Sequence, residues 1–340
     1  MHAKSTTPTG MSQVTHDTRS PPPAARGHLL TEQSLPASAN IDTMSVDQIL
    51  ACINDQDAIV PGVVRRAIPA ITRLVDDVVN AMSGGGRLIY LGAGTSGRLG
   101  VLDAAECPPT FHCDPADVVG IIAGGDQSLR RSSEGAEDNR TAASEQLEQL
   151  DVGQHDVVVG IAAGGTTPFV LGALDQAHDR GAITAMICCA RDQQTAQVAI
   201  DHVIEIPVGP EVVTGSTRMK AGTATKLVLN MISTATMVRL GKTWGNLMVD
   251  LCATNDKLRD RAGRMLQTYC ELSRDDALNL LDRADGHVKV AMVMHHRAVD
   301  AGTAQGLLDE HGGRLGNVIT GAAVNAHLYS QSSSRLPSGS

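Results

Sequence analysis

Five short apolar runs, separated by segments with helical spacing, constrain the fold more than any other feature of this sequence. A strand that is buried on both faces is apolar at nearly every position, and such strands belong to parallel sheets covered by helices. The predicted strands lie at 88–91, 118–123, 157–162, 183–188 and 203–206. The segments around them fit helices at 97–105, 138–150, 168–180, 193–200 and 219–240. We therefore predict an α/β fold with three layers, in which a parallel sheet is flanked by helices.

The chain ahead of the sheet region divides into a polar leader and a helical segment. Residues 1–27 are rich in Ser, Thr, Pro and Gly, so they bury too little apolar surface to offset the entropy of ordering, and we predict a disordered leader. Ser45 is a typical N-cap for a helix reaching about residue 54. A second helix should start at Pro61 and end at the three glycines 84–86. Its apolar stripe contains Val64, Ile68, Ile71, Val75 and Val78.

Beyond residue 251 the periodicity predicts only short helices, at 257–270, 274–283, 288–294 and 303–311. The expected organisation is a leader at 1–27, an N-terminal helical segment at 28–60, the α/β domain at 61–241, a helical domain at 242–330 and a disordered tail at 331–340.

Charge and cysteine content exclude several classes of function. The net charge of −9 argues against nucleic acid or an anionic membrane surface as a partner. The sequence contains no apolar run of the roughly 18 residues that a membrane helix needs. Seven cysteines without a C-x-x-C pair predict buried thiols in a reducing compartment, the cytoplasm, and no metal site.

A glycine-rich loop follows the first predicted strand and opens a helix. Residues 92–97 fit the G-x-G-x-x-G spacing of dinucleotide-binding folds, but the acidic residue expected about 20 positions later is not in place. Thr95, Ser96 and Gly97 instead indicate a site for one phosphate monoester, because a helix N-terminus offers free amide donors next to two hydroxyls. A glycine-rich turn that serves only packing is the structural alternative.

A second junction, at 162–168, repeats this design with Thr166 and Thr167 ahead of a proline that starts a helix. Open α/β sheets bind ligands at the carboxyl ends of neighbouring strands. The two junctions together predict one small phosphorylated ligand.

Five longer motifs identify a family resemblance. They are GAGTSGRLGVLDAAECPPT at 92–110, AGG at 123–125, EGAED at 134–138, TGSTRMKAGT at 214–223 and GNLMVD at 245–250. This set closely resembles the N-acetylmuramic acid 6-phosphate etherases, members of the sugar isomerase (SIS) fold superfamily, over roughly residues 31–313. The resemblance implies an SIS-type sandwich.

The resemblance also implies a reaction, cleavage of the lactyl ether of N-acetylmuramic acid 6-phosphate to N-acetylglucosamine 6-phosphate and D-lactate during cell-wall recycling. In the open-chain sugar the aldehyde acidifies the proton on carbon 2, so that lactate leaves carbon 3 by elimination and water then adds. This chemistry needs a base and an acid but no metal and no organic cofactor, because the carbonyl accepts the electrons.

By resemblance Glu106 protonates the departing lactate and Glu137 removes the carbon 2 proton. Glu106 follows directly on the helix predicted at 97–105, where the helix dipole disfavours an anion. Glu137 has a structural alternative, since it could carry charge at the start of the helix predicted at 138–150.

Departures from the family pattern concern substrate affinity. At 163–168 the chain reads AGGTTP where the family usually has ASGRTP, so one hydroxyl and one arginine are missing, and Thr166 can compensate for the hydroxyl. Leu35 replaces a common asparagine, and Ser132 and Ser133 replace an Ala-Val pair.

Two other functions fit parts of the pattern. A non-catalytic sugar-phosphate-binding regulator, resembling the glucokinase regulatory protein, would use the same fold without turnover, but that regulator has two SIS domains. An aldose–ketose isomerase would share the phosphate loops and have no use for the motif around Glu106. The family resemblance further implies a homodimer whose sites draw residues from both chains, with apolar surface supplied by the helix predicted at 219–240.

Overall fold

The computed structural model describes residues 27–131, 133, 135–191, 195–253 and 255–319. The predicted disordered leader, apart from Gly27, and the predicted tail at 331–340 lie outside these residues. In the described part of the chain, no helix combines the length and the apolar character needed to cross a membrane.

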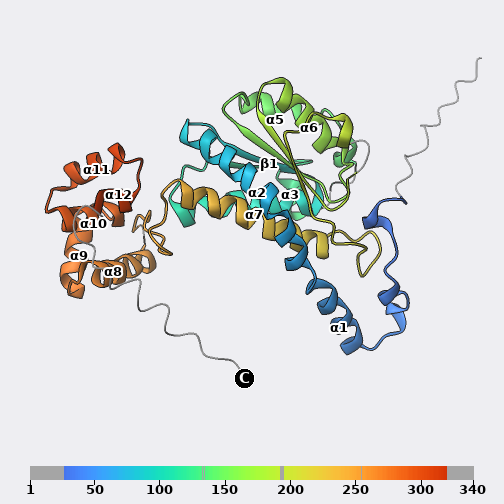
Figure 1. Cartoon of the computed structure of the whole chain (residues 1–340), viewed down its shortest axis with the longest axis horizontal. Coiled ribbons are helices and arrows are strands. Elements are labelled where there is room, and N and C mark those ends of the chain that lie inside the picture. Colours follow the sequence, from blue (N-terminus) through green and yellow to red (C-terminus); the bar gives the residue numbers. More distant parts are fainter. Residues whose placement is uncertain (1–26, 132, 134, 192–194, 254, 320–340) are drawn as a thin grey trace, which may run out of the picture.

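A parallel sheet of five strands forms the centre of the main domain, as predicted (Figure 1). The strands are β1 (Leu88–Gly92), β2 (Val118–Ile122), β3 (Val157–Ile161), β4 (Ile183–Cys188) and β5 (His202–Glu205). Their spatial order is β2-β1-β3-β4-β5, and Leu88 is in register with both Val118 and Val157. Strands β1 and β3 are buried along their full length, so the continuous apolar runs reflect burial on both faces.

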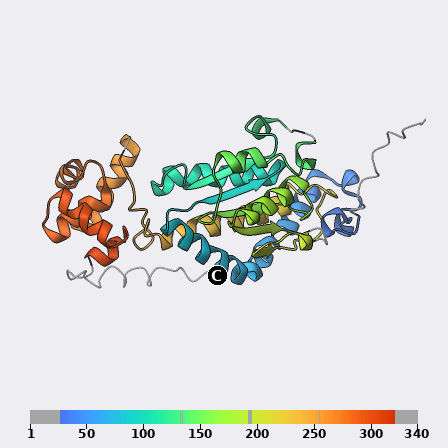
Figure 2. The ribbon, with the colours of Figure 1, turned by 90° about the horizontal axis from the view of Figure 1, so that it is seen from above.

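Helices cover both faces of this sheet and complete the three predicted layers (Figures 1 and 2). One layer contains α2 (Val60–Ser83), α3 (Gly94–Phe111) and α7 (Lys220–Arg239), whose buried side chains share a core with Leu88, Tyr90 and Val159. The other layer contains α5 (Ser144–Gln149) and α6 (Pro168–Asp179), which pack on Ile89, Leu91 and Val158. Between β2 and α5 lie the short α4 (Gln127–Arg130) and a 3₁₀ turn, η4 (Ala136–Asp138).

The N-terminal segment begins with three 3₁₀ turns, η1 (Leu30–Glu32), η2 (Pro36–Ser38) and η3 (Ile41–Thr43), which precede α1 (Val46–Asp57). Ser45 is the N-cap of α1, as predicted, and forms a capping box with Gln48. Helix α2 begins one residue before Pro61 and ends at the glycines. Its apolar stripe is buried as predicted except at Ile68, which is 43% exposed.

Helix α3 is longer than predicted, and the prediction that Glu106 follows the end of a helix is wrong. The helix continues through Pro108 and Pro109 to Phe111, where His112 ends it with a left-handed conformation (φ 50°). A proline inside a helix has a suitable φ, but it removes one donor and its ring crowds the carbonyl four residues earlier, so packing has to offset this cost. Buried Cys107 and Phe111 anchor the last turns against the core.

Two further helix predictions fail where side chains form other hydrogen bonds, a local one in the first segment and a long-range one in the second. The segment at 138–150 is helical only over α5, since the Asn139 side chain accepts hydrogen bonds from the amide (3.0 Å) and hydroxyl (3.1 Å) of Thr141, a turn that competes with a helix. The described part of the segment predicted at 193–200, residues 195–200, contains only a 3₁₀ turn, η5 (Thr195–Gln197). Buried Thr195 donates to the carbonyl of Gly165 at 2.6 Å; residues 192–194 lie outside the described residues.

The C-terminal helices enclose a hydrophobic cluster of their own, beside the main domain in Figures 1 and 2. Helix α9 matches its prediction residue for residue, and the others differ by three residues or fewer at either end. The short α12 was not predicted. These helices are α8 (Asp256–Cys270), α9 (Arg274–Arg283), α10 (Val288–Arg297), α11 (Ala301–Glu310) and α12 (Leu315–Ile319).

Candidate active site

The strand order singles out one edge of the sheet. From β1 the chain crosses to β2 on one side, and β3 lies on the other side of β1. In an open α/β sheet, ligands bind outside the carboxyl ends of the strands at such a reversal. The glycine-rich loops after β1 and β3 are therefore neighbours, as their spacing in the sequence predicted.

A cavity of about 250 Å³ opens between these two loops. Thr95 and Ser96 reach it from the start of α3, and Thr166 and Thr167 reach it from the start of α6. In the described part of the chain, none of these four hydroxyls has a hydrogen-bond partner. The structure thus brings together the four hydroxyls predicted to bind phosphate, beside the amide donors of two helix N-termini.

Gly97 contributes backbone geometry rather than cavity wall. A Cβ at this position would lie 2.5 Å from the Gly92 carbonyl oxygen, so the glycine allows α3 to pack directly on β1. Gly165 has a φ of +68°, and a Cβ there would lie 2.6 Å from the Ala190 carbonyl oxygen. Both loops hold shapes that a larger residue would disturb.

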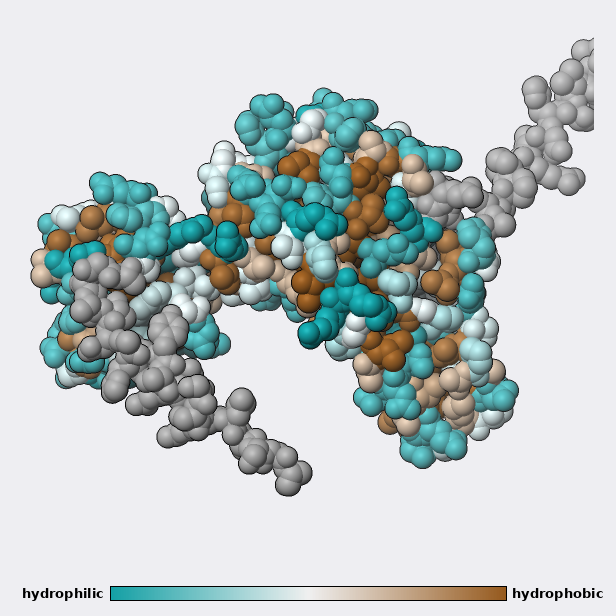
Figure 3. Space-filling view, viewed as in Figure 1, coloured by the Kyte–Doolittle hydropathy of each residue, from teal (hydrophilic) through white to brown (hydrophobic). Residues whose placement is uncertain are grey.

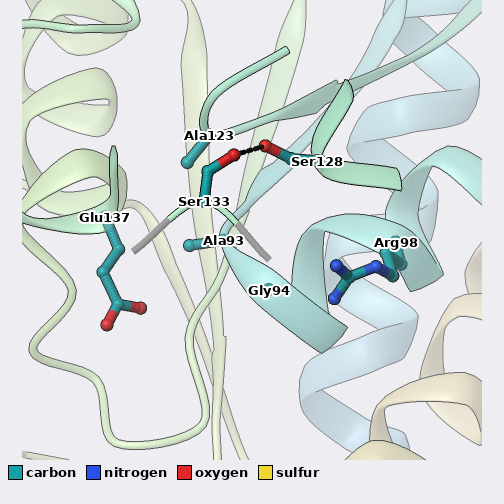
Figure 4. Close-up of a pocket in the computed structure, with 7 residues that line it drawn as sticks. All are labelled: Ala93, Gly94, Arg98, Ala123, Ser128, Ser133 and Glu137. Atoms are coloured by element: carbon teal, nitrogen blue, oxygen red, sulfur yellow. Dashed lines mark hydrogen bonds between the residues drawn. The ribbon is translucent and has the colours of Figure 1, made fainter. Parts of the chain in front are cut away.

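A second, smaller hollow of about 90 Å³ adjoins the first. It lies at the carboxyl ends of β1 and β2, where Ala93 and Ala123 line it. Its lining includes Arg98, Ser128 and Ser133, together with Ala93 and Gly94, which also line the first cavity (Figure 4). Glu137 lines both hollows. It belongs to the 3₁₀ turn η4 and not to the start of a helix, so the structural role considered for it does not apply.

The N-terminal segment closes one side of the larger cavity, which the sequence did not predict. Leu29, Thr31 and Glu32 line it together with Gly215 and Thr217, and the Glu32 carboxylate lies directly beside Gly215. Thr31 is buried, whereas Glu32 is exposed to the cavity. The only sequence signal was that the family resemblance begins at residue 31. Arg98 and Ser128 were also missed, although Arg98 lies within the glycine-loop motif.

Glu106 lies outside both hollows. It is exposed on α3, twelve residues after Gly94, which places it about 18 Å along the helix axis from the cavity. The structure therefore does not bring Glu106 and Glu137 together within one chain, and the catalytic role of Glu106 stays a prediction.

The core beneath α3 is apolar, but it contains the buried carboxyl group of Asp103, three residues before Glu106. Buried Asp103 receives a hydrogen bond from Lys226 at 3.3 Å. Burial, and then the negative charge of Asp103, raise the pKa of the Tyr90 hydroxyl well above its usual value and the pKa of the Cys107 thiol to about 12. These two groups stay protonated at neutral pH.

The seven cysteines are all free. Five are buried as predicted, but Cys52 and Cys252 are half-buried, because they lie on α1 and on the linker to the C-terminal helices rather than in a core.

Comparisons with known proteins agree on fold and family. Residues 139–235 match the SIS domain, and residues 70–178 match the glucokinase regulatory protein N-terminal SIS domain. An N-acetylmuramic acid 6-phosphate etherase of Gloeobacter violaceus is 52% identical, over 85% of this chain and 94% of that protein. The corresponding protein of a Jannaschia species is 54% identical, over 78% of this chain and 84% of that protein. That of Cutibacterium acnes is 51% identical, over 88% of this chain and 96% of that protein.

Proposed function

The chain belongs to the N-acetylmuramic acid 6-phosphate etherases, which are carbon–oxygen lyases, and from that premise we propose how its cleft performs the reaction. The observation that carries the proposal is the position of Glu137 between two adjoining hollows. One of them is lined, at two helix N-termini, by four hydroxyls that have no hydrogen-bond partner among the described residues. The relatives favour an etherase over the non-catalytic regulator that was the alternative.

The larger cavity holds the 6-phosphate. Helix N-termini stabilise negative charge, and the hydroxyls of Thr95, Ser96, Thr166 and Thr167 supply additional donors. No lysine or arginine lines this cavity among the residues described, so binding relies on dipoles and hydroxyls. In this arrangement the family arginine that Thr166 replaces is not needed for phosphate binding.

Glu137 acts on carbon 2. Its carboxylate takes the proton, the C–H electron pair forms the carbon 2–carbon 3 double bond, and the bond from carbon 3 to the ether oxygen breaks. The departing lactate oxygen receives a proton from an acid. Water then adds its oxygen to carbon 3 and a proton returns to carbon 2, which gives N-acetylglucosamine 6-phosphate and D-lactate.

The acid is Glu106 of a second copy of the chain, because Glu106 is too far from its own cleft. Exposed apolar side chains supply the surface for that copy. Helix α1 has no buried residue, and its Val46 and Leu50 are 72% and 60% exposed; a helix of this length needs a packing partner. On α3, Leu102 lies one turn before Glu106 and is 44% exposed, and α7 exposes Met231 and Val238. Figure 3 shows apolar side chains on the projecting N-terminal part.

We place this homodimer in the cytoplasm. The seven free thiols suit a reducing compartment, and a phosphorylated sugar is an intracellular form of substrate.

The direct test is to incubate the purified chain with N-acetylmuramic acid 6-phosphate and to quantify D-lactate and N-acetylglucosamine 6-phosphate. Equal amounts of both products are expected, with no ketose formed from N-acetylglucosamine 6-phosphate. Binding without lactate release would identify a regulator, and ketose formation would identify an isomerase.

A further inference from the structure

The smaller hollow contains the one cationic side chain that lines either part of the cleft among the described residues, Arg98. Its Nε donates to the Leu129 carbonyl oxygen at 3.1 Å, which fixes the plane of the guanidinium. The N–H groups on its two terminal nitrogens have no acceptor within the described ranges. A half-buried arginine with its fork unpaired is typical of a site for a planar anion.

Hydroxyls complete this hollow. Ser128 is 3% exposed, and its Oγ lies 2.6 Å from the Oγ of Ser133. Whichever hydroxyl donates within this pair, the other keeps its own hydrogen for a ligand oxygen. Gly124, at a φ of +81°, leaves room for the pair, because a Cβ there would lie 2.4 Å from the Ser128 hydroxyl. The hollow therefore offers a cationic fork and a free hydroxyl donor.

The position of the smaller hollow indicates which of the two anionic groups of the substrate, the phosphate or the lactyl carboxylate, it binds. The phosphate has a site in the larger cavity, on the β3 side of β1, whereas Arg98 lies on the β2 side. Figure 4 shows the Arg98 guanidinium and the Glu137 carboxylate on opposite sides of Gly94. A sugar held by its 6-phosphate with carbon 2 at Glu137 carries the substituent on carbon 3 next to Glu137, toward the smaller hollow.

We propose that Arg98, with Ser128 and Ser133, forms the subsite for the carboxylate of the lactyl group and so selects substrates that carry this ether. The inference rests on the proposed function and adds a specificity-determining residue to it. Binding the carboxylate fixes the leaving group so that its ether oxygen is aligned with the carbon 2 proton that Glu137 removes.

The test compares ligands with and without the lactyl group. In Arg98→Gln, the KM for N-acetylmuramic acid 6-phosphate should rise by about 10- to 100-fold, the range for losing a charge-assisted hydrogen bond. The inhibition constant of N-acetylglucosamine 6-phosphate, which lacks the lactyl group, should stay within about 2-fold, and this also shows that the cleft is folded. Arg98→Lys should lose part of the affinity because its ammonium is not a fork. Arg131→Gln, an exposed arginine nearby, is the matched control.

A substrate in which the lactyl carboxylate is a carboxamide gives the reciprocal measurement, with N-acetylglucosamine 6-phosphate formation as the readout. The wild type should use the amide about 10- to 100-fold less efficiently than the acid, whereas Arg98→Gln should use the acid and the amide almost equally well. If Arg98 contacts the lactyl carboxylate, the effect of removing the arginine and the effect of removing the carboxylate charge are not additive. Equal weakening of both phosphorylated ligands would assign Arg98 to the phosphate, and unchanged constants would remove it from binding; either result overturns the proposal. Absence of lactate release by the wild type would instead contradict the proposed function.

Discussion

At the scale of single residues, the proposed phosphate site relies on hydroxyls rather than on cations. We predict that Thr95→Ala combined with Ser96→Ala raises the KM for N-acetylmuramic acid 6-phosphate by about 10-fold or more, because each hydroxyl donates to a charged ligand. The turnover number should change less. Steady-state kinetics measure both, with Thr72→Ala on exposed α2 surface as the control. An unchanged KM would mean that the phosphate binds elsewhere.

The two glutamates should separate into distinct partial reactions. Glu106→Gln should abolish lactate release while still exchanging the carbon 2 proton of N-acetylglucosamine 6-phosphate with deuterated water, because Glu137 is intact. Glu137→Gln should lose both, since each acid or base step contributes about 10²- to 10⁴-fold. Mass spectrometry of the recovered sugar gives the exchange. Exchange that survives in Glu137→Gln and is lost in Glu106→Gln would reverse the two roles.

The residues that the sequence predicted for the site and those that it missed differ in a physical way. Thr95, Ser96, Thr166 and Thr167 follow strands, and the ends of adjacent parallel strands always meet at one edge. Glu32 reaches the site because the N-terminal segment folds back over the cleft. No periodic pattern in the sequence predicts that arrangement. Glu106 belongs to the same motif as Thr95, yet a straight helix separates them by several turns.

At the scale of elements, an ion pair between half-buried Arg87 and buried Asp156 joins the starts of β1 and β3. Asp156 accepts from Arg87 through Nε at 2.9 Å and Nη2 at 2.8 Å, and from the Gly153 amide at 3.1 Å. Burial alone would raise the pKa of Asp156, but the hydrogen bonds from Arg87 and Gly153 outweigh it, so this pKa lies below its usual value. The carboxylate is thus stabilised in the folded state.

We predict that Asp156→Asn lowers the free energy of unfolding at pH 7 by about 1 to 3 kcal/mol. A carboxyl whose pKa is depressed by folding contributes stability above its unfolded pKa, about 3.9, and loses it as the pH falls through the folded value. The difference between the two proteins should therefore shrink below about pH 4. Urea unfolding across this range measures it. Asp282→Asn, which removes an exposed pair with Arg259, should change little, and a pH-independent difference for Asp156→Asn would contradict the account.

The elements themselves were predictable where burial dominates. Strands β1 to β5 and helices α6, α7 and α9 match because their apolar patterns report the sheet and the core directly. The segment at 138–150 was not predictable in this way, since its first residues form a turn in which the Asn139 side chain accepts from Thr141, a contact that hydrophobic periodicity does not report. The end of α3 was missed because two prolines suggest a stop, whereas buried Phe111 extends the helix.

At the scale of the whole molecule, the C-terminal helices are tied to the end of α7 by charge. Asp250 lies 2.8 Å from the Lys242 ammonium and 3.2 Å from that of Lys289, so one carboxylate joins the main domain to α10. Burial lowers the pKa of Lys289, although Asp250 opposes that effect. This contact could not be predicted from the sequence, because the three residues are up to 47 positions apart.

The proposed sharing of the active site between two subunits can be tested with mixed dimers. Glu106→Gln and Glu137→Gln are each expected to be inactive, but a dimer with one subunit of each has one cleft in which both glutamates are intact. Equal mixing should restore about a quarter of the wild-type lactate release, since half of the dimers are mixed and each has one complete cleft. If both glutamates came from the same chain, mixing would restore no activity.

The central claim is that the ether breaks at carbon 3 by elimination, followed by addition of water. The reaction in water labelled with oxygen-18 and deuterium tests this most directly, with both products analysed by mass spectrometry and NMR. We predict oxygen-18 in the carbon 3 hydroxyl of N-acetylglucosamine 6-phosphate, deuterium on carbon 2 and unlabelled oxygen in the hydroxyl of D-lactate. Oxygen-18 in that lactate hydroxyl, with carbon 2 still carrying its original proton, would contradict the account.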